Sequence, residues 1–61
     1  MTNLMELPPP SRAEMLAEID REMKQRAIVY PRLINERALS VKTADRRKQI
    51  MLALRDLVER T

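Results

Sequence analysis

The chain has 61 residues, and its 12 basic and 9 acidic side chains give a formal net charge of +3. A chain of this length holds one domain at most and buries little apolar surface, so it needs disulfides, a metal ion or a second chain for stability. It contains no Cys, His or Gly. This excludes disulfides, thiolate metal sites, histidine bases, and the phosphate-binding loops and tight hairpins that need Gly at a positive φ.

Helix-forming residues dominate the sequence, while one aromatic residue and three Val are too few to indicate a sheet. The predicted fold class is therefore all-α. No apolar run reaches the roughly 18 residues that span a bilayer, and the first six residues lack the basic start and apolar core of a signal peptide. We expect a cytoplasmic protein that binds no cofactor and no membrane.

In chain order, residues 1–10 form an extended arm that ends in three prolines, which cannot be helical. Ser11 and Glu14 then have the spacing of a capping box, in which a hydroxyl and a carboxylate satisfy the first free N–H groups of a helix. The helical part of the chain is accordingly predicted over residues 11–61.

The first helix carries an apolar stripe with helical spacing. Its charged residues lie mostly outside that stripe, and Asp20–Lys24 and Glu22–Arg26 have the favourable order for ion pairs one turn apart. The stripe consists of Leu16, Ile19, Met23, Ala27 and Tyr30, broadened by Met15 and Ile28.

Pro31 interrupts this helix, because it has no N–H for the carbonyl of Ala27 and its ring crowds that carbonyl. Either the helix bends and continues to Asn35, or it stops near Tyr30 and Pro31 begins a new turn. The apolar residues that follow Pro31 keep to the stripe. We therefore predict a first helix that is continuous and kinked at Pro31.

The turn is predicted at Asn35–Leu39, with Ser40 as the N-cap of a second helix that runs from Val41 to about Glu59. A connection this short predicts an antiparallel helical hairpin. The apolar stripe of the second helix consists of Ala44, Arg47, Ile50, Met51, Leu54, Leu57 and Val58.

Both stripes are wider than a single helix–helix seam, so two hairpins are expected to pair into a four-helix homodimer. The predicted self-association residues come from the middle of the first stripe and the C-terminal half of the second. They are Leu16, Ile19, Met23, Met51, Leu54, Leu57 and Val58.

Charge is unevenly distributed along the chain. Residues 1–23 carry two basic and five acidic side chains, a net −3, whereas residues 24–48 carry eight basic and two acidic side chains, a net +6. In a hairpin the positive segment lies at the turn end, where it is either a solvated surface or a site for an acidic protein or a nucleic acid. The predicted binding residues are Arg26, Arg32, Arg37, Lys42, Arg46, Arg47 and Lys48.

Tyr30 is the one aromatic residue and stands on the apolar stripe beside Pro31. We expect its ring in the core with the hydroxyl at the edge. The alternative is an interface anchor formed together with Arg32, because Tyr and Arg are enriched at such positions.

Four residues around Tyr30, namely Val29, Tyr30, Pro31 and Arg32, begin a pattern that continues in the second helix with Ala44, Arg46, Arg47 and Met51. Over residues 18–58 the chain resembles small uncharacterised helical proteins of bacteriophages and prophages with a Val-Tyr-Pro-Arg core. The resemblance implies phage origin and a helical pair, and it implies no activity. Members of that group often carry Gly in the turn, where this chain has Glu36 and Arg37.

The predicted function is a small interaction module that binds and modulates a host or phage protein. The alternative is a DNA-binding dimer, because residues 32–47 can be read as a helix, a turn and a basic recognition helix. An enzyme is not predicted. The carboxylate pairs Glu14/Glu18 and Glu18/Glu22 resemble those of metal-binding bundles, but they lack the His partners.

Overall fold

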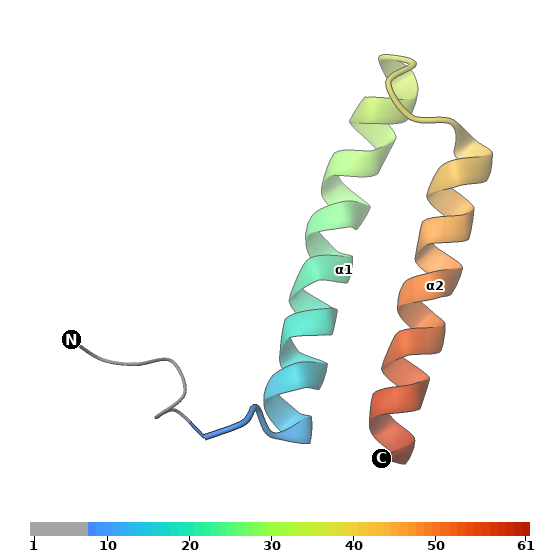
Figure 1. Ribbon diagram of the computed structural model, residues 1–61. Coiled ribbons are helices and arrows are strands. Elements are labelled where there is room, and N and C mark those ends of the chain that lie inside the picture. The colour runs from blue at the N-terminus through green and yellow to red at the C-terminus, as the bar shows by residue number, and fades with distance from the viewer. Residues whose placement is uncertain (1–7) are drawn as a thin grey trace.

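The computed structural model describes residues 8–61, which form two helices packed side by side and running in opposite directions (Figure 1). α1 spans Arg12–Asn35, α2 spans Val41–Arg60, and no strand occurs among the described residues. The predicted all-α class and the two-helix hairpin are confirmed. Residues 1–7 of the predicted arm lie outside the described residues. The described part of the arm, Pro8, Pro9 and Pro10, is not helical.

Both helices begin at the predicted caps. The Ser11 hydroxyl accepts a hydrogen bond from the Glu14 N–H at 3.1 Å, and the Glu14 carboxylate accepts one from the Ser11 N–H at 3.1 Å, which completes the capping box. At α2 the Ser40 hydroxyl accepts from the Thr43 N–H at 3.1 Å. Because these groups satisfy N–H donors that have no partner inside the helix, they fix where each helix starts.

Pro31 lies inside α1, which continues to Asn35. The continuous helix is therefore confirmed, and the alternative of a stop near Tyr30 is wrong. The lost bond to the Ala27 carbonyl is tolerated because the flanking turns are held by their own hydrogen bonds and by packing against α2.

The turn begins one residue later than predicted, at Glu36, because Asn35 still belongs to α1. Arg37 has φ 61°, in the left-handed region. Its N–H donates to the Ile34 carbonyl at 3.0 Å, and the Ala38 N–H donates to the Leu33 carbonyl at 2.9 Å. This is a Schellman motif with Arg in the place that usually holds Gly. The expectation that a chain without Gly has no positive φ at a tight turn is wrong here.

Burial is slight throughout the hairpin. Among the described residues Ala44 is the one buried side chain, at 7% exposure, and it lies in the first turn of α2. The other residues at the seam are half-buried. They are Leu16, Ile19, Met23, Tyr30 and Ile34 of α1 with Met51, Arg55 and Val58 of α2.

Each helix has one neighbour, which covers only part of its wide apolar stripe. Ile28, expected to broaden the first stripe, is 78% exposed, and Arg47, Ile50, Leu54 and Leu57 of the second stripe also face outward. In an α-helix successive residues are turned by about 100°. Ile50 and Leu57 therefore point well away from the seam that Met51 and Val58 occupy.

Candidate functional site at the turn end of the hairpin

A groove of about 240 Å³ lies between the helices in the half of the hairpin next to the turn. Its walls are mainly apolar, with charged groups among them, and both helices contribute. The volume is below that of typical drug-sized pockets, so the groove fits one or two side chains of a larger partner. The lining residues are Met23, Arg26, Ala27, Tyr30, Pro31, Ile34, Ala44, Asp45, Lys48 and Met51.

Tyr30 forms part of this wall together with Arg26. The guanidinium carbon of Arg26 lies 6.0 Å from the centre of the Tyr30 ring, at the outer limit of a cation–π contact. The Arg26 Nε also donates to the Glu22 carboxylate at 3.0 Å, which confirms the predicted pair. Tyr30 is half-buried, so it packs at the seam and still presents a side to the groove. Its two predicted roles are therefore compatible.

The other six predicted binding residues differ from Arg26 in one respect. None of them forms an ion pair with a carboxylate within residues 8–61, and Arg46 makes only a long hydrogen bond of 3.4 Å to Gln49. All six are exposed. Their charges are thus available to a partner. These residues are Arg32, Arg37, Lys42, Arg46, Arg47 and Lys48.

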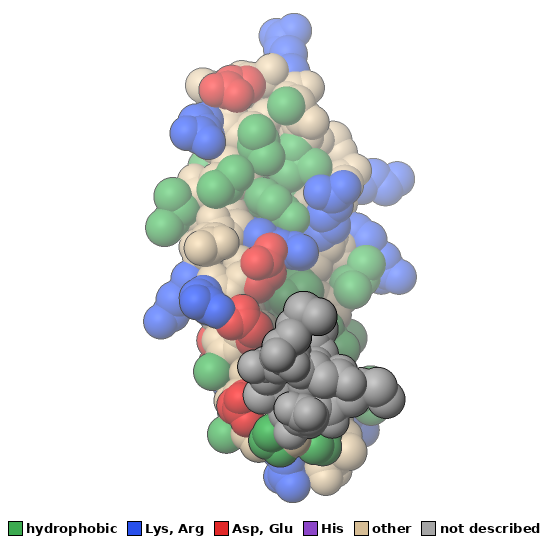
Figure 2. Space-filling model, turned by 60° about the vertical axis from the view of Figure 1, so that its left-hand side comes forward, with side chains coloured by type: hydrophobic (Ala, Val, Ile, Leu, Met, Phe, Trp, Pro, Cys, Tyr) green, Lys and Arg blue, Asp and Glu red, His purple; other side chains and the backbone are tan. Residues whose placement is uncertain are grey.

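These cations lie around the turn end and do not all face the same side of the hairpin. Arg32 comes two residues after Tyr30, and Arg46 two residues after Ala44, so each points roughly away from the groove. Lys48 lines the groove itself. Figure 2 accordingly shows basic side chains on several sides of the molecule, around a patch of hydrophobic side chains.

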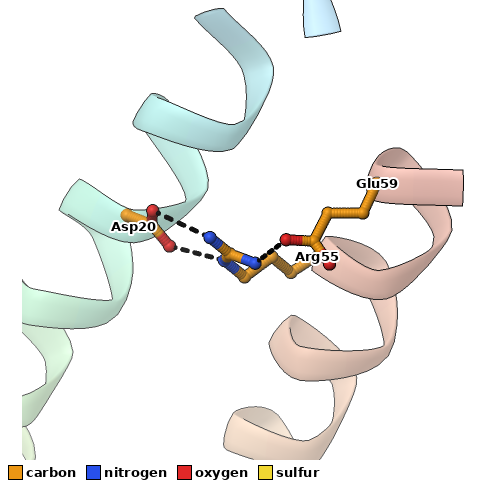
Figure 3. Close-up of polar contacts among 3 residues, drawn as sticks. All are labelled: Asp20, Arg55 and Glu59. Atoms are coloured by element: carbon orange, nitrogen blue, oxygen red, sulfur yellow. Dashed lines mark hydrogen bonds and ion pairs between the residues drawn. The ribbon is translucent and has the colours of Figure 1, made fainter. Parts of the chain in front are cut away.

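The opposite, open end holds most of the ion pairs. Arg55 of α2 reaches across to Asp20 of α1, with Nε 2.8 Å and Nη2 3.3 Å from the two carboxylate oxygens, and it also pairs with Glu59 (Figure 3). The bond from Arg55 lowers the pKa of the Asp20 carboxyl, and the same contacts with Asp20 and Glu59 raise the pKa of Arg55. This forked pair joins the two helices and fixes which residues lie level.

This contact was not predicted from the sequence, in which Lys24 on the same helix is the expected partner of Asp20. That ion pair does not form, and Lys24 adds only a Coulombic contribution that lowers the pKa of Asp20. The spacing of Asp20 and Arg55 in the sequence does indicate the contact. Asp20 follows Leu16 by four residues and Arg55 follows Met51 by four, so each stands where the seam expects an apolar side chain.

The predicted self-association residues separate into two groups. Five of them face the seam inside one hairpin, whereas Leu54 and Leu57 point outward at 42% and 64% exposure. Leu54 lines a second, shallow groove with Met15, Ile19 and Val58 near the open end. The seam residues are Leu16, Ile19, Met23, Met51 and Val58.

The acidic residues considered as a metal or catalytic site are each engaged in other contacts. Glu14 caps α1, and its bonds to the backbone and side chain of Ser11 lower its pKa. Glu18 pairs with Arg21, and Glu22 pairs with Arg26. Within residues 8–61 no three His, Cys, Asp or Glu side chains are placed to hold a metal ion. Neither described helix has an apolar stretch long enough to cross a membrane.

Comparison of the chain with protein-family models, curated proteins and solved structures finds no match.

Proposed function

We propose that this chain is a small helical interaction module whose basic turn end binds a protein partner and modulates it. The observation that carries the proposal is the division of ion pairs. The turn end has six exposed cations without a carboxylate partner among the described residues, whereas Arg21, Arg55 and Arg60 near the open end are paired with carboxylates and Arg12 there donates to the Thr61 carbonyl at 3.3 Å. Cations left unpaired beside an apolar groove favour a partner with both acidic and apolar side chains.

The conformation of Arg37 supports a role for its charge. Left-handed backbone is unfavourable for residues with a Cβ, and Gly is the usual solution at this point of a turn. A long cationic side chain at φ 61° therefore lowers stability. Residues in such conformations are enriched at functional sites, which is the reason to include Arg37 in the binding surface.

The resemblance to small phage proteins supports a host or phage protein as the partner, encountered in the host cytoplasm. In the same proposal two hairpins pair into a four-helix dimer, and α1 bends at Pro31. The dimer is supported by the exposed Ile50, Leu54 and Leu57, since stable monomers of this size rarely leave such side chains uncovered. The bend is supported by the ring of Pro31 against the Ala27 carbonyl.

DNA binding is the second candidate, favoured by the same unpaired cations. Its support is weaker. The two helices of a helix-turn-helix cross at a steep angle, whereas α1 and α2 lie side by side and antiparallel (Figure 1). The cations also point in several directions, so they present no single surface to a duplex.

The test uses tagged protein as bait in host lysate, with and without nuclease and at two salt concentrations. The Arg32→Ala/Arg46→Ala variant removes two charges from the turn end. The matched control, Arg21→Ala/Arg60→Ala, removes the same charge from the open end. We expect a protein that is captured after nuclease treatment, lost with the turn-end variant and kept with the control.

Two results would contradict the proposal. Binding that disappears with nuclease favours DNA. Equal capture by both variants shows that the turn-end charges do not matter.

A further inference from the structure

A second surface of the hairpin is separate from the turn-end groove. Ile50, Leu54 and Leu57 stand one turn apart on the outside of α2 and are 52%, 42% and 64% exposed. Met15 of α1 lies against the same surface, because it lines one shallow groove with Leu54. We name these four residues the outer apolar face. None of them lines the turn-end groove.

We propose that a second copy of this chain covers the outer apolar face in an antiparallel arrangement, with the open end of each hairpin over the turn end of the other. The inference rests on the proposed dimer and adds its surface and its orientation. The axis of such a dimer passes close to Ile50, which lies at the middle of α2.

The spacing on α2 fits this arrangement. Thr43, Ile50 and Leu57 follow each other at seven residues, and Arg47 and Leu54 alternate with them, which is the repeat of helices that pack along their length. All five are exposed. With Ile50 on the two-fold axis, Leu57 of one copy lies beside Thr43 of the other, each about 10 Å from the axis at 1.5 Å per residue.

The distribution of charge selects the antiparallel orientation. Residues 8–23 carry a net −2 and residues 24–48 a net +6, so a parallel pair would place like charges side by side. The Asp20–Arg55 contact fixes the levels of the two helices and puts Glu18 at about the level of Leu57. In the antiparallel dimer that level is within about one helical turn of Arg47 of the second copy. Opposite charges then meet at both ends.

Cysteine cross-linking tests the orientation in the full chain, which has no native Cys. A disulfide needs Cα atoms within about 7 Å of each other. We expect rapid oxidation of Ile50→Cys to a covalent dimer, and a mixed product from Thr43→Cys with Leu57→Cys. Leu57→Cys alone should react no faster than Ile28→Cys, a control for random collision on an exposed position outside this face.

Charge reversal tests the same orientation without cross-links. Glu18→Arg and Arg47→Glu should each raise the dimer dissociation constant about fivefold or more, since two exposed ion pairs are lost per dimer. Because Glu18→Arg also breaks the pair of Glu18 with Arg21 inside the hairpin, the informative result is the double variant, which should return the dissociation constant toward the original value. Sedimentation at several protein concentrations measures these constants.

Different results would contradict the dimer and its antiparallel orientation. A folded monomer that persists at micromolar concentration overturns the dimer itself. A dimer in which Leu57→Cys cross-links with itself while the mixed pair does not, or in which the double reversal gives no rescue, overturns only the antiparallel orientation.

Discussion

Replacing Arg37 by Gly is expected to stabilise the hairpin although it removes a side chain. Arg37 has φ 61° and closes the Schellman motif at the end of α1. Left-handed backbone costs a residue with a Cβ about 1–2 kcal/mol. Gly avoids that cost but loses more backbone entropy on folding, by about 0.5–1 kcal/mol. The difference leaves a gain of about 0.5–1 kcal/mol per chain, which corresponds to roughly 2–8 °C in Tm for a domain of this size.

The assay is thermal unfolding followed by circular dichroism at one protein concentration, because the Tm of an associating chain depends on concentration. Arg37→Ala removes the same charge and keeps the Cβ, so it should gain little. Glu36→Gly places Gly at the preceding residue, which has φ −80°, and should not stabilise. If Arg37→Gly is no more stable than Arg37→Ala, the reasoning from backbone geometry is refuted. A stabilised Arg37→Gly that binds its partner less well would support the functional role of this side chain.

Three further predictions concern α1 and its contacts. Ser11→Ala should lower stability by about 1 kcal/mol, since it removes the cap of α1, whereas Ser11→Asp should not, and urea unfolding measures both. Pro31→Ala should stabilise α1 by about 1–3 kcal/mol, because it restores the N–H that bonds the Ala27 carbonyl; an unchanged or lower stability would show that the helix is adapted to Pro31. Asp20 and Glu14 have pKa values lowered below the ordinary 3.8 and 4.5, so their contribution is present at neutral pH and lost as pH falls through the folded pKa values. Asp20→Asn and Glu14→Gln together should therefore flatten the loss of Tm between pH 5 and 2, and a variant that keeps the full slope would contradict this assignment.

The helix boundaries could be predicted from the sequence because each boundary depends on a few adjacent residues. Ser11 and Ser40 are followed by the N–H groups that their hydroxyls accept from, and the missing N–H of Pro31 is a local defect that neighbouring turns tolerate. The continuous α1 and the hairpin could thus be predicted from the sequence alone.

Contacts between the helices were harder to predict, since they depend on how the two stripes are rotated against each other. The sequence spacing favours an i,i+4 ion pair between Asp20 and Lys24, yet Arg55 of α2 donates two hydrogen bonds to Asp20. Ile50 and Met51 are equally apolar neighbours, and only the packing decides that Met51 faces the seam while Ile50 faces outward. The left-handed Arg37 was missed because its residue type opposes that conformation.

The two proposed surfaces together determine how many partners a dimer can hold. In the antiparallel arrangement the turn ends lie at opposite ends of the bundle, separated by roughly the 30 Å length of α2. Each turn-end groove is lined by residues of a single chain, so pairing through Ile50, Leu54 and Leu57 leaves both grooves complete, although Arg47, which lies on the dimer surface, is then no longer available to the partner. The dimer would then bind two partner molecules, one at each end, and a dimeric partner with suitable spacing would bind with increased avidity. A parallel dimer would instead place both basic ends together, where their repulsion and their closeness would favour one large acidic partner.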